Sequence, residues 1–287
     1  MEPTRRLLIG GLAAVGLAGN TWKGEPLPQD VPTPPNPDPQ AAVQAMRARA
    51  MASLLRHEKV TVPGAKALAE WKKLRAAKQE WPVVIGGDAD LERIANQFSF
   101  DDPIVSGAPV GTVVPRSVEQ LLAAAAKVRF PADLYKVAET SPPTESEPLP
   151  SNWPVPSEEV PPGLTAAEEL QTGRPLEKVH ILILPTDKSW EVPAYLHWGG
   201  WNACPPPELH VAALQSWHER FGAELAGLNG DTMNVRIRNR PKDREQAWQL
   251  AHELHAYCPD IVDQGLGSMA AFASELMRTD WWFFWWD

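Results

Sequence analysis

Apolar residues recur at helical spacing in several stretches of the chain, and this pattern predicts the helices. In the stretch 207–222, Leu214, Trp217 and Phe221 fall on one face of a helix. Asp243 is placed to cap a later helix, because its side chain can accept a hydrogen bond from a free backbone amide. The other predicted helices share this spacing or a high content of strong helix formers, and they cover residues 41–59, 65–79, 88–98, 115–139, 243–258 and 268–276.

Short runs of β-branched and aromatic residues, bounded by turn residues, predict strands in the second half of the chain. Residues 179–186 and 190–198 are expected to pair as one hairpin. Asn229-Gly230 is a strong turn dipeptide and is expected to join the two strands of a second hairpin.

A short buried strand is also expected over residues 83–85, followed by a turn at Gly86-Gly87. A Gly-Gly turn before a helix could hold an anion, but the glycine and lysine spacing of a phosphate-binding loop is missing, so we interpret it as a tight turn. Strands and helices intermingle without a regular βαβ repeat. The predicted fold class is therefore α+β, with a C-terminal mixed sheet covered by helices and preceded by a mainly helical region.

The chain closes with six consecutive aromatic residues, 281–286. The run is far too short to anchor the protein in a membrane. Exposed rings could stack on a ligand, whereas a strand would point alternate rings to opposite faces of a sheet. Because each buried ring contributes about 2 kcal/mol, and a strand that is apolar on both faces is typical of a sheet centre, we predict a buried central strand.

The first residues resemble an export signal. Arg5 and Arg6 precede a mildly hydrophobic run that is too short to span a membrane, a pattern similar to a bacterial twin-arginine signal peptide over residues 1–22. A proline-rich tether follows at residues 23–40. We expect a periplasmic or cell-envelope protein, or a cytoplasmic one if the leader does not function.

The rest of the chain divides at a second segment rich in proline and glutamate. This connecting segment covers residues 141–163, between a mainly helical N-terminal region at 41–140 and a C-terminal α+β domain at 164–287.

Composition narrows the classes of partner. The net charge is −9 and no basic block follows the leader, so the protein lacks the cationic face that nucleic acid requires. The mature chain contains no run of 18 or more apolar residues, so we predict no transmembrane span. No cofactor motif is present, and the expected partner is an unknown small ligand or a protein.

The C-terminal half carries a family resemblance. The segments WGGWNACPPPELHVAALQSWHERFGAELAGLNGDTMNVRIR, AYCPDIVDQGLGSMAAFASEL and DWWFFWWD follow one another in the order seen in the bacterial family called domain of unknown function 4253. Similar patterns occur at WPVVIGGDADLERI and GRPLEKVHILILPT. The resemblance implies no established activity, and His252 and His255 depart from the residues it leads us to expect.

The chain has two cysteines, Cys204 and Cys258. In an exported protein they could form a disulfide, worth about 4 kcal/mol in the chain-entropy model, or they could be two buried free thiols. Zinc could in principle use both thiols with His255, but the paired ligand spacing of a zinc site is missing, so we predict no metal.

An enzyme would most simply use the Cys204 thiol as its nucleophile. His197 or His255 could serve as the base, with Asp260 or Asp263 to orient it, but the sequence supplies residue types without geometry. His180 alternates with apolar residues on a strand and is predicted to be a core histidine.

Two glycine-rich loops are the best candidates for a ligand site, because loops after regular elements often display binding groups. Their candidate ligand-binding residues are Trp198, Trp201, Asn202, Asp260, Asp263 and Gln264. Capping of turns and helix ends is the alternative role of such polar side chains. The sequence thus favours a non-enzymatic binding module, with a hydrolase or thiol-dependent enzyme using Cys204 as the alternative.

Overall fold

The computed structural model describes residues 56–77, 80–97, 116–144, 149–155, 163–169 and 171–286. The predicted leader and tether lie outside these residues. Among the residues that are described, no helix is both long enough and apolar enough to cross a membrane.

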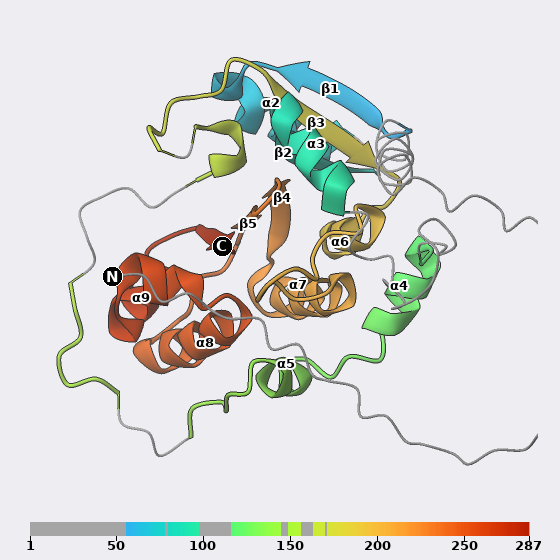
Figure 1. Ribbon diagram of the computed structural model, residues 1–287. Coiled ribbons are helices and arrows are strands. Elements are labelled where there is room, and N and C mark those ends of the chain that lie inside the picture. The colour runs from blue at the N-terminus through green and yellow to red at the C-terminus, as the bar shows by residue number, and fades with distance from the viewer. Residues whose placement is uncertain are drawn as a thin grey trace, which may run out of the picture. The chain divides into compact units, whose positions relative to one another are not determined.

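A mixed sheet forms the centre of the fold (Figure 1). Its strands are β1 (Glu58–Val62), β2 (Trp81–Gly86), β3 (Val179–Leu184), β4 (Glu224–Leu228), β5 (Thr232–Arg236) and β6 (Trp281–Trp285), in the spatial order β1-β3-β2-β4-β5-β6. The β2–β4 pair is parallel and the other neighbouring pairs are antiparallel. The predicted α+β class is confirmed.

Helices cover both faces of this sheet. They are α2 (Gly64–Ala77), α3 (Asp88–Gln97), α4 (Val118–Ala125), α5 (Ala132–Val137), α6 (Val192–Tyr195), α7 (Pro207–Phe221), α8 (Arg244–Tyr257) and α9 (Met269–Leu276), with short turns η1 (Thr165–Ala167), η2 (Ser189–Glu191) and η3 (Ile261–Leu266).

The two faces can be distinguished at strand β5. Asn234 points to η1, where its side-chain oxygen accepts a hydrogen bond from the Ala166 amide at 2.9 Å. The adjacent residue, Met233, points to the opposite face, where it contacts the Tyr257 hydroxyl of α8. Helices α7 and α8 lie side by side on this second face (Figure 1), where the rings of Trp217 and Tyr257 meet at 4.8 Å.

Local sequence signals placed several helices correctly. Ser117 caps α4 through a capping box with Gln120, and the Asp243 side chain accepts a hydrogen bond from the Gln246 amide at the start of α8. Gly222 ends α7 in a left-handed conformation (φ 62°), which glycine adopts without strain.

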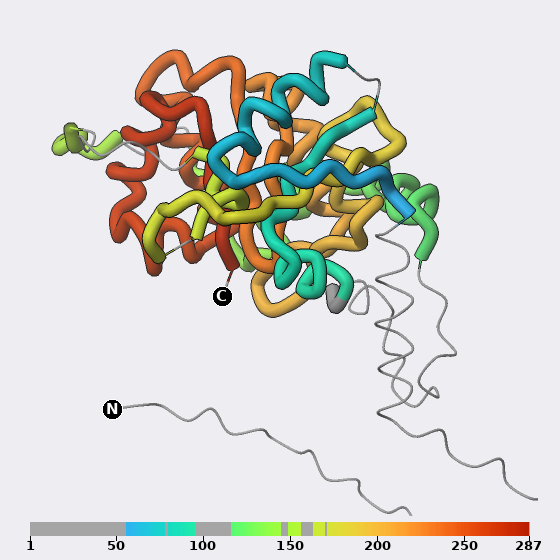
Figure 2. Tube along the Cα trace, turned by 90° about the horizontal axis from the view of Figure 1, so that it is seen from above, coloured from blue at the N-terminus to red at the C-terminus, as the bar shows by residue number. Residues whose placement is uncertain are grey.

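The prediction that a helix continues to residue 59 is wrong. Strand β1 begins at Glu58, where Val60 and Val62 alternate with more exposed residues, and it runs antiparallel to β3. Figure 2 shows β1, in blue, running alongside β3. Strands from both predicted regions of the chain therefore share one sheet.

The predicted strand at 190–198 is also wrong. Its residues form the turn η2 and the short helix α6 instead. Pro193 explains the difference, because proline has no amide hydrogen to donate to a sheet but fits the first turn of a helix.

Strand β6 confirms that the aromatic tail forms a buried strand, but its predicted central position is wrong. It pairs only with β5 among the described strands, and so lies at an edge of the sheet. Trp282, Phe284 and Trp286 are buried against α7 and α8, whereas the alternate rings are half-buried. One face of the strand, rather than both, carries the core.

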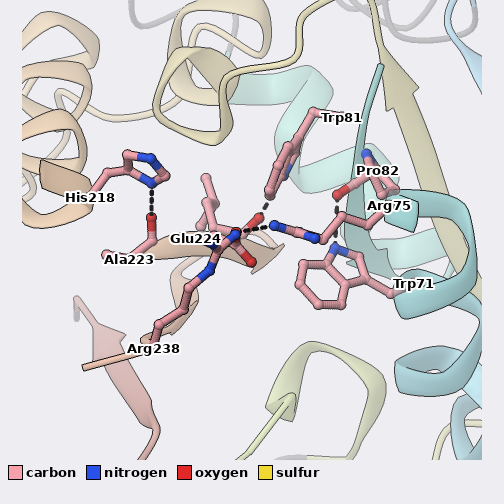
Figure 3. A network of polar contacts seen from close by, with 9 residues as sticks. Trp71, Arg75, Trp81, Pro82, His218, Ala223, Glu224 and Arg238 are labelled. Atoms are coloured by element: carbon pink, nitrogen blue, oxygen red, sulfur yellow. Dashed lines mark hydrogen bonds and ion pairs between the residues drawn. The ribbon is translucent and has the colours of Figure 1, made fainter. Parts of the chain in front are cut away.

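A buried carboxylate ties the N-terminal elements to the C-terminal ones (Figure 3). Glu224 of β4 is paired with Arg75 of α2 and with Arg238, which follows β5. The Arg75 guanidinium also lies over the Trp81 ring, 5.6 Å from its centre, and the Trp81 indole donates a hydrogen bond to the Leu225 carbonyl at 2.8 Å. These contacts fix α2 and β2 against β4.

Candidate functional site

Both predicted loops reach the same buried group of side chains. This group, which we call the histidine cluster, consists of Trp198, Cys204, His210, Tyr257 and Trp286. Trp198 and Cys204 come from the first loop, and Tyr257 directly precedes the second loop. The structure thus brings the bases of the two loops together.

His210 connects the members of the cluster. Its Nε2 atom lies 3.4 Å from the Cys204 thiol, and its Nδ1 atom is hydrogen-bonded to the Tyr257 hydroxyl. The Trp198 and Trp286 rings lie 4.8 and 5.6 Å from its ring centre.

The first loop can approach His210 closely because position 199 is a glycine. Gly199 has a φ of 119°, and a Cβ atom there would lie 2.7 Å from the His210 ring and 2.3 Å from the Pro205 carbonyl oxygen. A larger residue would strain the backbone and push the loop away from the cluster.

Burial keeps the cluster uncharged. It lowers the pKa of His210 to about 3 and raises the pKa of the Cys204 thiol well above its ordinary value. The pKa of Tyr257 is likewise raised by burial. A neutral thiol and a neutral imidazole therefore face each other near pH 7, whereas thiol enzymes act through a thiolate.

The candidate residues of the first loop have different environments. Trp198 is fully buried, and its indole donates a hydrogen bond to the Asn229 carbonyl at 2.7 Å, so it serves the core in this structure. Trp201 is half-buried with its ring edge-on to Trp198 at 4.8 Å. Asn202 is exposed, with a positive φ of 46°.

The second loop presents its polar residues around η3. Asp263 is exposed and lies 3.1 Å from the His255 ring, while the Gln264 amide donates a hydrogen bond to the half-buried Asp260 at 2.7 Å. Both pairs are contacts between residues close in the sequence, and they stabilise this loop.

Both cysteines are free thiols, so the disulfide considered from the sequence is not formed in this structure. The Cys258 thiol donates to the Trp285 carbonyl at 2.9 Å, and burial raises its pKa to about 12. Within the described part of the chain, no three histidine, cysteine or acidic residues are grouped so that they could hold a metal ion.

His210 is the residue that the sequence interpretation missed. The thiol alternative considered His197 and His255, but the histidine in contact with Cys204 is His210. It lies one helical turn before Leu214 on the apolar face of α7, a spacing that could have revealed it as a buried histidine.

His180 is buried as predicted, and it is satisfied by two partners. Its ring nitrogens lie 3.0 Å from the Thr61 hydroxyl and 2.6 Å from Asp88. The Gly87 amide donates to the Asp90 carboxylate at 2.8 Å. Acidic side chains therefore already occupy the amide end of this turn, which agrees with its interpretation as a tight turn.

Together these features define an α+β domain with a mixed sheet, whose polar loops lie over a buried and uncharged histidine cluster. Residues 180–287 match the family model described as "Domain of unknown function (DUF4253)", and this part of the chain carries that domain. The match confirms the resemblance over these residues, and the similar pattern at residues 81–94 lies outside it. Neither the curated proteins nor the solved structures gave a match.

Proposed function

We propose that the protein is a non-enzymatic module that binds a small ligand or a protein through the loops at 198–204 and 258–266. The exposed residues Asn202, Asp263 and Gln264 would supply its polar contacts. Support comes from the base of the loops: they are anchored by the buried histidine cluster, and rigid elements hold binding groups in fixed positions.

The observation that carries the proposal is the burial of the Cys204 thiol and the His210 imidazole, which favours their neutral forms. A nucleophilic cysteine needs a lowered pKa and access to substrate. Cys204 has a raised pKa and is only 4% exposed. These properties favour a structural role for Cys204 and binding, rather than bond cleavage, as the function of the loops above it.

A thiol-dependent hydrolase remains the second candidate function, because the Cys204 sulfur and the His210 ring are only 3.4 Å apart. For this function, the loop would have to open and a proton would have to move from the thiol to the imidazole. Both steps oppose the burial that holds the pair neutral.

Labelling and ligand screening separate the two candidates. With iodoacetamide at pH 7, Cys204 in the native protein is expected to react at least about 100-fold more slowly than an unfolded thiol, because burial raises its pKa and blocks access. A thermal-shift screen of small metabolites and peptides is expected to give stabilising ligands. Their effect should be lost in the variant that combines Asn202→Ala with Asp263→Ala and kept in the control variant Gln215→Ala.

Two results would contradict the binding proposal. One is rapid alkylation of Cys204 together with ester or amide hydrolysis that disappears in Cys204→Ala. The other is a set of ligands whose stabilising effect is the same in the loop variant and in the wild-type protein.

We further propose that the protein is exported through its twin-arginine-like leader, which lies outside the described residues. Arg5 and Arg6 support this proposal together with the apolar run that follows them. In bacterial cell fractionation the full chain is expected in the periplasm or envelope. The variant with Arg5→Lys and Arg6→Lys is expected to stay in the cytoplasm, and equal distribution of the two proteins would contradict export by this route.

A further inference from the structure

A surface cavity of about 400 Å³ lies away from the two loops, where α5, α7 and α8 meet. Its volume falls in the range of small-molecule sites, roughly 300–1,000 Å³. The lining residues come from all three helices and from the residues on either side of α5; they are Pro131, Tyr135, Pro142, Arg220, Phe221, Gln246, Gln249, Leu250 and Glu253.

The cavity has one wall outside the family-matched domain. Pro131, Tyr135 and Pro142 precede residue 180, whereas the residues of α7 and α8 lie within the match. The N-terminal part of this chain therefore completes a cavity that the matched domain alone would leave open on one side.

The charged groups of the cavity neutralise each other. Arg220 forms two hydrogen bonds with the carboxylate of Glu253, which is buried. The Trp217 indole donates a further hydrogen bond to the same carboxylate at 2.6 Å. An anion would be attracted by Arg220 and repelled by Glu253, and a cation would experience the reverse, so the cavity favours an uncharged ligand.

Several polar groups around the cavity retain hydrogen-bonding capacity. Tyr135 lines the cavity and is 7% exposed, and its hydroxyl can both donate and accept a hydrogen bond. Burial and the neighbouring Glu253 raise its pKa to about 12, so it remains a hydroxyl donor near pH 7. The exposed Gln249 amide offers a donor and an acceptor, and the Gln246 side-chain oxygen already accepts from the Lys242 amide, which leaves its NH₂ group available.

This combination suits a ligand whose groups both donate and accept hydrogen bonds. A hydroxyl group does both, whereas a carbonyl only accepts. The planar amide of Gln249 can contact two adjacent hydroxyls, and the prolines with Leu250 offer an apolar wall for the carbon skeleton.

We propose that this cavity binds an uncharged, hydroxyl-rich small molecule of the monosaccharide or polyol class, held chiefly by Tyr135 and Gln249. The proposal is independent of the loop function, since the two sites share no residue.

Titration calorimetry with defined probes tests the proposal. The probes are glucose, galactose, mannose, N-acetylglucosamine, myo-inositol and glycerol, with glucuronate and glucosamine as charged analogues. At least one neutral probe is expected to bind, and more tightly than the charged analogues. The variants Tyr135→Phe and Gln249→Leu should each weaken its binding by about 3- to 10-fold, the effect of one lost hydrogen bond.

Two controls keep the result specific. Gln215→Leu changes an exposed α7 glutamine that pairs with Glu219 outside the cavity, and it should leave binding unchanged. Asn202→Ala should also leave it unchanged, because that residue lies in the first loop. The proposal is overturned if none of the neutral probes binds, if charged analogues bind as well as neutral ones, or if Tyr135→Phe and Gln249→Leu bind like the wild-type protein.

Discussion

Replacing Trp217 with alanine is expected to lower the free energy of unfolding by about 4 kcal/mol. Trp217 is fully buried on α7, where its ring stacks on Phe284 at 5.6 Å and meets Trp282 edge-on at 5.7 Å. Its loss would leave a large cavity between α7 and the last strand. It would also remove the indole hydrogen bond to Glu253.

Urea unfolding of Trp217→Ala and Trp153→Ala provides a matched comparison. Trp153 is half-buried and lies under the Arg244 guanidinium at 5.2 Å, so its removal should cost only about 1 kcal/mol. Because native proteins have total stabilities of roughly 5–15 kcal/mol, Trp217→Ala should lose a large share of the free energy of unfolding. Similar losses for the two variants would show that the packing of Trp217 against Phe284 and Trp282 is not a main source of stability.

Acidification is expected to destabilise the protein through His210. The folded-state pKa of this histidine is about 3, below its ordinary value of 6.5. Between these values the unfolded chain binds a proton that the folded protein does not. Stability is therefore present in full above pH 6.5 and decreases as the pH falls towards 3, by at most about 1.4 kcal/mol per pH unit from this residue.

The variant His210→Gln isolates this contribution, because its side chain is polar and does not titrate. The free energy of unfolding is measured for the wild-type protein and for His210→Gln at several pH values between 7.5 and 4. The difference between the two profiles is due to His210, since the acidic residues are common to both proteins. Cys204 and Tyr257, which face His210, have raised pKa values and stay neutral throughout this range. Parallel pH profiles for the two proteins would contradict the assignment.

Elements set by short-range signals could be predicted from the sequence. Ser117 and Asp243 act as helix caps, and Asn229-Gly230 joins β4 to β5, because each depends on hydrogen bonds or backbone angles within a few residues. Helices α7, α8 and α9 were predicted for a similar reason: their apolar residues repeat within one element.

Features that depend on distant parts of the chain could not be predicted in this way. The apolar pattern of residues 281–286 predicts a strand, but its edge position results from the order in which remote strands pair. The approach of Cys204 to His210 needs the tight turn at Gly199, and Tyr257 completes the cluster from another helix. The sequence predicts both loops, but it does not predict the histidine cluster beneath them.

The cavity between α5 and α8 shows the same limit. Gln246, Gln249, Leu250 and Glu253 lie on one face of a helix, a spacing that the sequence displays. Nothing in the sequence shows that Tyr135, from a separate helix, faces them.

The place of β2 in the sheet has a practical consequence for work on the isolated domain. Because β2 lies between β3 and β4, a fragment limited to residues 180–287 would lack the strand that bridges its two halves. Four open strand edges would replace two, and exposed edges promote aggregation. A soluble fragment for biophysical measurements should therefore start upstream of Glu58, well before residue 180, where the match to the family model begins.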